Sequence, residues 1–85
     1  MASDPKTSHE SETSARRRFA ARLTHARRTA GLNHAQAAKT NNIPVDRLRE
    51  IEGSLIWPTS DELDMMADKY GVPANWLTCT PPFDL

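Results

Sequence analysis

Two short helical segments joined by a brief turn, within residues 31–58, constrain this 85-residue chain more than any other feature. The first segment is predicted over about 34–40 from its small apolar residues. Asn42 interrupts it, because asparagine accepts the left-handed backbone conformation of a turn at modest cost. Pro44 suits the first turn of a second segment that ends near residue 52. Two helices joined by so short a turn predict a helix-turn-helix unit.

A polar segment and one long helix are expected before this unit. The first 13 residues show no apolar periodicity, which predicts a disordered N-terminal tail. Thr13 or Ser14 can cap the first helix, which runs to about Ala30 with apolar residues at helical spacing. A helix-turn-helix domain is therefore expected over 14–79.

Two further helices are expected after the unit. Thr59 and Glu62 have the spacing of a capping box, which predicts a helix that ends near Tyr70. Pro73 opens a short fifth helix, and residues 80–85 are expected to be extended. The chain is thus predicted to be all-α, with five helices.

Charge is unevenly distributed along a chain whose formal net charge is zero. Residues 14–56 hold nine basic and three acidic side chains, a net +6, whereas both ends are acidic. Only this middle part could attract phosphate, and the neutral total weakens long-range steering. The single cysteine, Cys79, excludes an internal disulfide and fits a reducing cytoplasm. No apolar run approaches the roughly 18 residues of a membrane span, so none is expected.

Residues 31–58 resemble the lambda-repressor/Cro-type helix-turn-helix family, also called the xenobiotic-response-element type. The positions that match its pattern without a gap are Gly31, Leu32, Asn33, Ala38, Ile43, Leu48, Ile51, Glu52 and Pro58. The likeness continues through the GVPANWL ending at 71–77 and covers about residues 15–79. The departures are His34 for the usual Gln, Asn42 for the turn Gly, a Gly53-Ser54 pair that shifts a Gly by one place, and Leu55-Ile56-Trp57 for a usually basic loop.

The resemblance implies a five-helix lambda-repressor-like domain that binds double-stranded DNA, with the segment 44–52 in the major groove. Its outward positions, the candidates for base contact, are Val45, Asp46, Arg47, Arg49 and Glu50. The alternative for these residues is a solvated helix face with local ion pairs. Asn33 and His34 begin the preceding helix, where family members contact a DNA phosphate. The alternative for His34 is an exposed histidine at a helix start.

Two further expectations concern contacts between protein groups. Arg27 and Glu52 are expected to form an ion pair, because the family often carries an Arg–Glu bridge at these places. The apolar loop Leu55-Ile56-Trp57 is unsuited to a sugar-phosphate backbone and favours a surface for a protein partner. The alternative for Trp57 is that it folds back onto the core.

The function implied is a sequence-specific transcriptional regulator, and more specifically a repressor, that binds an inverted repeat as a homodimer. A cytoplasmic, nucleoid-associated location follows. The alternative is an interaction module, such as an adaptor, antirepressor or antitoxin, on the same fold with weak or lost DNA reading. The two outward carboxylates of 44–52, Asp46 and Glu50, favour that alternative, as do the apolar loop and the neutral total charge. No enzyme activity, metal or cofactor is expected, because the histidines and Cys79 lack ligand spacing and no nucleophile or phosphate-loop pattern occurs.

Overall fold

Five helices and no strand make up residues 12–78, the part of the chain that the computed structural model describes. They are α1 (Glu12–Thr29), α2 (His34–Asn41), α3 (Val45–Glu52), α4 (Ser60–Tyr70) and α5 (Ala74–Thr78). The all-α prediction is confirmed for these residues. Most of the predicted N-terminal tail, Cys79 and the predicted extended C-terminal segment lie outside them.

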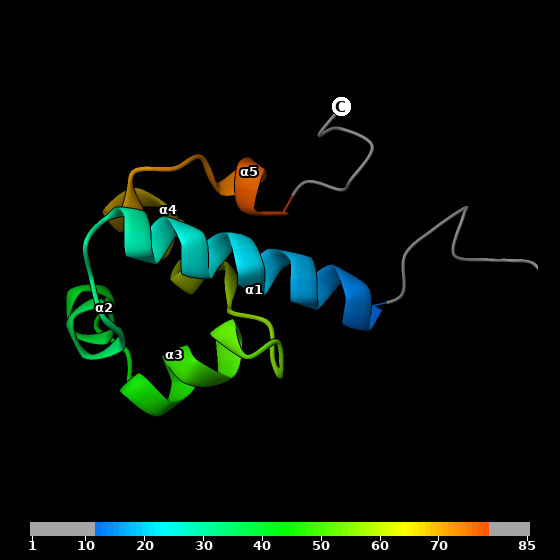
Figure 1. The fold of residues 1–85 in the computed structure, drawn as a ribbon, viewed down its shortest axis with the longest axis horizontal. Coiled ribbons are helices and arrows are strands. Elements are labelled where there is room, and N and C mark those ends of the chain that lie inside the picture. The colour runs from blue at the N-terminus through cyan, green and yellow to red at the C-terminus, as the bar shows by residue number, and fades with distance from the viewer. Residues whose placement is uncertain (1–11, 79–85) are drawn as a thin grey trace, which may run out of the picture.

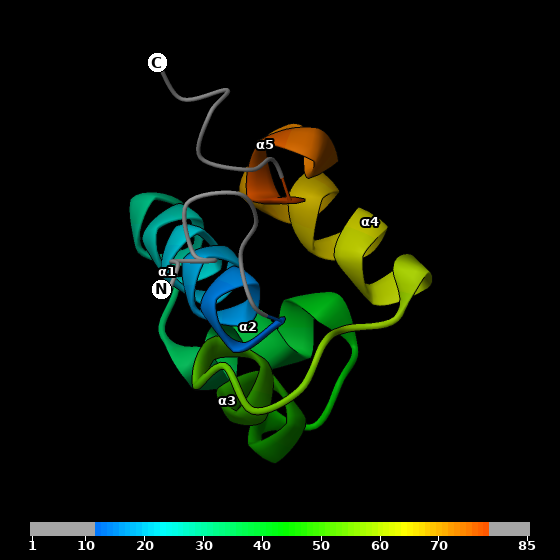
Figure 2. The same ribbon diagram turned by 90° about the vertical axis from the view of Figure 1, so that its right-hand side faces the viewer.

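The helices are arranged around α1, which is the longest (Figure 1). Viewed from the end of α1, α2 and α3 lie below it, and α4 and α5 lie to its right (Figure 2). In both views α3 lies at the lower edge of the molecule. One side of α3 is therefore left uncovered by the other helices.

One apolar core joins all five helices. Its largest fully buried side chains are Leu23, Leu48, Ile51, Met66 and Leu77. Ala37 and Ala38 are the buried residues of α2 in this core, and their small side chains allow α2 to cross its neighbours closely. Burial of this apolar surface is the main stabilising term for so small a domain.

Local hydrogen bonds set the limits of α2 and α4. The Asn33 side chain accepts from the Gln36 backbone N–H at 2.8 Å, and the Gln36 side chain accepts in return from the Asn33 backbone N–H. Thr59 and Glu62 form the predicted capping box at the start of α4. Asn42 ends α2 in the left-handed conformation, at φ 58° and ψ 45°, as its sequence position predicts. The C-cap at Asn42 fixes the short turn between α2 and α3.

The start of α1 and that of α3 differ slightly from expectation. Glu12 and Thr13 belong to α1 and not to a tail, and Thr13 and Ser14 lie within the helix instead of capping it. An acidic residue stabilises a helix N-terminus, and Glu12 also pairs with Arg16 one turn later at 3.1 Å. Pro44 is the N-cap of α3, one position before its predicted place in the first turn.

The loop after α3 contains a strained backbone position. Ser54 has φ +62°, in the left-handed region, while Gly53 beside it has an ordinary φ of −83°. A side chain at Gly53 would meet the Arg49 carbonyl oxygen at 3.0 Å. Gly53 is therefore needed because the backbone of Arg49 approaches it closely. Ser54 adopts the left-handed conformation, which is energetically unfavourable for a residue with a side chain.

Replacing Ser54 with glycine is expected to stabilise the protein by about 0.5–1 kcal/mol. Glycine removes the strain of the left-handed conformation, and the greater conformational freedom of glycine in the unfolded chain offsets only part of this gain. A rise of about 2–6 °C in the thermal midpoint should follow. Ser54→Ala is the matched control, because it removes the hydroxyl but keeps the strained Cβ. A gain of the same size in both variants would contradict the strain account.

Candidate functional site

The outer face of α3 is the most accessible of the sequence-predicted sites. Asp46, Arg49 and Glu50 are exposed, while Val45 and Arg47 are half-buried. The opposite face carries Leu48 and Ile51 into the core. The exposed face presents two carboxylates, so it is close to electrically neutral when Arg47 and Arg49 are included.

Arg47 already has a partner within the protein. Its Nη2 donates to Glu62 Oε1 at 2.8 Å, and its Nε donates to the other carboxylate oxygen of Glu62. The hydrogen bond with Glu62 raises the pKa of Arg47, and the bond from Arg47 lowers the pKa of Glu62. A two-point contact of this kind links α3 to the first turn of α4. Sequence reasoning placed Arg47 among base-contacting residues and Glu62 in the capping box alone, and it missed this link.

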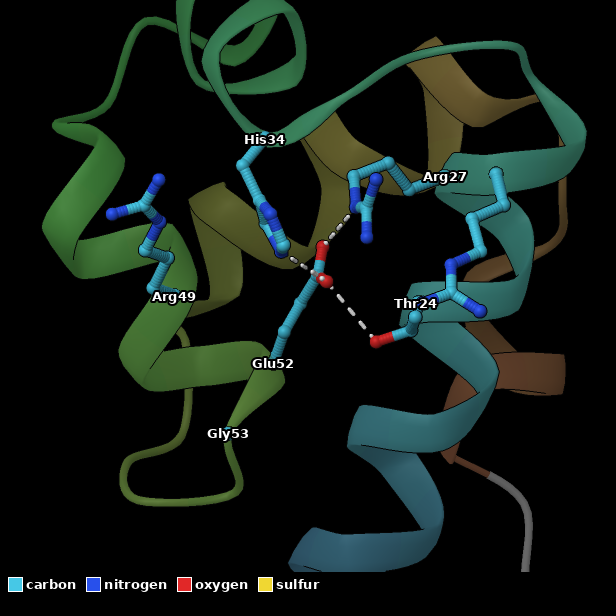
Figure 3. A pocket seen from close by; sticks show the side chains of 7 residues that line it. Thr24, Arg27, His34, Arg49, Glu52 and Gly53 are labelled. Carbon is cyan, nitrogen blue, oxygen red and sulfur yellow. Dashed lines mark hydrogen bonds and ion pairs between the residues drawn. The ribbon is translucent and has the colours of Figure 1, made fainter.

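Glu52 is the meeting point of α1, α2 and α3. Its Oε2 accepts from Arg27 Nε at 2.7 Å, which is the ion pair that the sequence predicts. Its Oε1 lies 3.1 Å from Thr24 Oγ1, which donates to it, and 3.0 Å from His34 Nε2 (Figure 3). The Arg27 and Glu52 side chains are each only 5% exposed. Arg27 also donates from Nη1 to the Leu32 carbonyl oxygen at 2.8 Å, which holds the segment that leads into α2.

An open pocket of about 320 Å³ lies over this junction. Its lining residues are Thr24, Arg27, Arg28, His34, Arg49, Glu52 and Gly53 (Figure 3). The structure thus brings four predicted site residues together: His34, Arg49 and the Arg27–Glu52 pair. Thr24 was not singled out from the sequence, and Gly53 was noted only for its shifted position. Arg28 was counted among the basic side chains of residues 14–56 that could attract phosphate, but no pattern placed it beside His34 and Arg49.

Asn33 and the first turn of α3 lie outside this lining set. The Asn33 side-chain oxygen is used by the capping bond to Gln36, so its amide NH₂ group is the part left to contact a ligand. Val45, Asp46 and Glu50 do not line the pocket. Of the predicted phosphate-contacting and base-contacting residues, only His34 and Arg49 therefore line the pocket.

The apolar loop after α3 is held against the start of α1. Arg16 Nε donates to the Ser54 carbonyl oxygen at 2.9 Å, and the Trp57 indole N–H donates to Glu12 at 3.2 Å. The Trp57 ring lies 5.5 Å from that of Phe19. Trp57 nevertheless remains 40% exposed.

The three residues of the candidate protein interface do not behave alike. Ile56 packs against the core, whereas Leu55 is 68% exposed. Trp57 is intermediate, with one side against α1 and the other open to solvent. The part of the loop that could receive a partner is therefore Leu55 and the outer side of Trp57.

Within the described range, no group of three or more His, Cys, Asp or Glu side chains is placed to hold a metal ion. No helix formed by residues 12–78 is long and apolar enough to cross a membrane. Comparison of the chain with protein-family models, with curated proteins and with solved structures finds no match.

Proposed function

We propose that this protein is a DNA-binding transcriptional regulator, and more specifically a repressor, that places α3 in the major groove. The observation that carries the proposal is the combination of a tight α2–turn–α3 unit with an outer α3 face that the described chain leaves open. Eight residues give a rod about 12 Å long, and an α-helix is about 10–12 Å across with its side chains, which fits the roughly 12 Å width of the major groove. The lambda-repressor-like fold, the cytoplasmic nucleoid location and the absence of enzymatic activity are parts of the same proposal.

Specific residues take separate roles in this proposal. Val45 can pack on a thymine methyl group, and Asp46 and Glu50 can accept from cytosine N4. Asn33 and His34 begin α2, whose positive dipole end favours a backbone phosphate. Arg47 holds α4 through Glu62 and is assigned no base. A homodimer would present two α3 helices to half-sites about one helical turn apart.

Selection from random duplexes at low salt tests the proposal. Enrichment of an inverted repeat is the expected result. The variant Asp46→Ala should relax the selected base at one position, with discrimination there reduced by about 1–3 kcal/mol. Asp64→Ala is the matched control, because Asp64 is an exposed aspartate on α4, away from α3. Equal effects of the two variants would remove Asp46 from the readout.

A second candidate function is an interaction module in which DNA reading is lost. The exposure of Leu55 and Trp57 favours it, because large apolar side chains exposed close together in one loop suit a protein partner. The near-neutral charge of the exposed α3 face also favours an interaction module. The duplex selection separates the two functions: a failure to enrich any duplex at low salt would support the module.

A further inference from the structure

Leu55 and the outer side of Trp57 form an apolar patch, here called the Leu55 patch, that the described chain leaves open. Leu55 is 68% exposed and Trp57 is 40% exposed, and a single residue separates them in the loop after α3. Large apolar side chains exposed close together mark an interaction site, whereas single ones scattered over a surface do not. The patch therefore has the character of an interface.

The Leu55 patch is held in one arrangement before any partner binds. The Trp57 indole N–H donates to Glu12 at 3.2 Å, which fixes the ring against the start of α1. The Leu55 backbone N–H donates to the Glu50 carbonyl oxygen at 3.0 Å, and Ser54 beside it keeps its strained left-handed conformation. Backbone strain of this kind is found where a loop serves a function. A preorganised patch also loses little conformational freedom when it binds.

The charges at the edge of the patch match those of a second copy of this chain. Glu12 accepts from Trp57, and Arg16 donates to the Ser54 carbonyl oxygen at 2.9 Å, so both α1 side chains lie beside the loop. Glu12 is negative and Arg16 is positive. When two copies meet about a two-fold axis, each carboxylate can therefore face a guanidinium group of the other copy. A patch bordered by charges of one sign would repel its own copy.

The place of the patch in the fold also suits a two-fold pair. The start of α1 and the loop after α3 lie at the end of the molecule that faces the viewer in Figure 2, which is the right-hand end in Figure 1. A half-turn about a vertical axis at that end sets a second copy beside the first and leaves both α3 helices at the lower edge. Two α3 helices open to the same side are the arrangement that an inverted repeat requires.

We propose that two copies of this chain pair through the Leu55 patch, with Leu55 close to the two-fold axis. The pair is weak in free solution, because two apolar side chains on each copy are far fewer than the roughly 20–30 residues a side of a stable interface. A duplex that holds two copies on adjacent half-sites raises their effective concentration to about the millimolar range, which completes the pairing. Leu55 thereby joins the two half-sites and contacts neither base nor phosphate.

Self-association without DNA is the first test. Raising the concentration of the full chain from micromolar to millimolar should shift the Leu55 and Trp57 NMR signals, and sedimentation equilibrium should give a dimer with a Kd of about 0.1–1 mM. Leu55→Ser should weaken the dimer about ten-fold or more, since each dimer buries two leucine side chains. Met65→Ser is the matched control, because Met65 on α4 is an apolar side chain with 41% exposure. A monomer at every concentration, or equal loss in the Met65 variant, would overturn the interface.

Cross-linking tests whether Leu55 lies near the axis. Leu55→Cys is made in a chain whose only natural cysteine, Cys79, is replaced by serine. This variant should form a disulfide-linked dimer under mild oxidation, because two cysteines with Cα atoms within about 7 Å can be bridged. Met65→Cys in the same background should stay monomeric under the same conditions. Equal cross-linking at the two positions would contradict the placement of Leu55 at the axis.

Binding to the inverted repeat from the duplex selection is the last test, and it rests on the proposed function. Leu55→Ser should lose about ten-fold or more in affinity for the full repeat and keep its affinity for a single half-site. Equal loss on both duplexes would assign Leu55 to a DNA contact and overturn the pairing. Self-association without duplex enrichment would retain the pairing face and remove DNA reading. Independent binding of two copies to the repeat would remove the pairing face alone.

Discussion

Replacing Glu52 with glutamine should lower the free energy of unfolding by about 3–5 kcal/mol. The total stability of a domain this small is of similar size. The variant is therefore expected to be largely unfolded at room temperature, or folded only at reduced temperature. Denaturant unfolding followed by circular dichroism measures the change.

The size of this effect comes from the groups that Glu52 leaves behind. Arg27 is buried, and within residues 12–78 its ion pair is with Glu52 alone, so the substitution would leave an uncompensated cation in the core. Glutamine can still accept a hydrogen bond from Thr24 or His34 but carries no charge. The three helices that meet at this carboxylate would lose their common anchor.

Two further variants test whether the loss of stability comes from breaking the buried ion pair or from removing any negative charge on α3. Glu50→Gln removes an exposed carboxylate from the same helix and should change stability by less than about 0.5 kcal/mol. The double variant Arg27→Met, Glu52→Met removes both charges and should recover most of the loss, because buried ion pairs can be replaced by apolar groups. Full stability in Glu52→Gln would show that Arg27 does not depend on this carboxylate.

Elements whose limits depend on local chemistry could be predicted from the sequence. The Thr59–Glu62 capping box occurs as predicted, because each side chain satisfies the backbone N–H of the other residue. Asn42 is left-handed as predicted, because asparagine accepts that backbone conformation at modest cost. The Arg27–Glu52 pair was reached by a different route, through family resemblance. Spacing alone could not have indicated it, since the two residues are 25 positions apart.

Contacts between distant segments account for most of what the sequence did not reveal. Glu62 was explained by its cap, so nothing suggested that Arg47 would reach it from another helix. The joint pocket of Arg28, His34 and Arg49 depends on the crossing of three helices, which no pattern within one helix encodes. Ile56 and Leu55 are equally apolar in the sequence, and only packing sends the first to the core and the second to solvent.

Alkaline conditions should destabilise the protein through Tyr70. Burial, followed by the negative charge of Glu52, raises the pKa of this phenol to about 12. Its hydroxyl oxygen accepts from Asn41 Nδ2 at 3.2 Å, a contact that links α4 to α2. The hydrogen bond from Asn41 and the positive charge of Arg27 lower the pKa of Tyr70, but burial and Glu52 outweigh them, so a phenolate is disfavoured here.

The raised pKa of Tyr70 determines how the stability of the protein depends on pH. The folded protein holds the proton more tightly than the unfolded chain, whose tyrosine titrates near its ordinary pKa of about 10. The associated stability is complete below about pH 10 and is lost as the pH rises towards 12. The raw shift corresponds to about 2.7 kcal/mol. Tyr70 remains 7% exposed, and screening by solvent reduces the expected loss to about 1–2 kcal/mol.

Tyr70 is the only tyrosine in the chain, so tyrosinate absorbance reports its ionisation directly. In the folded protein the absorbance should change near pH 12, whereas the free energy of unfolding, measured from about pH 9 to pH 11, should stay level up to about pH 10 and fall above it. Tyr70→Phe cannot ionise and should lose less stability over that range, although it should start about 0.5–1.5 kcal/mol lower because it lacks the bond to Asn41. Ionisation near pH 10 in the folded protein would mean that the α2–α4 contact leaves the hydroxyl open to water.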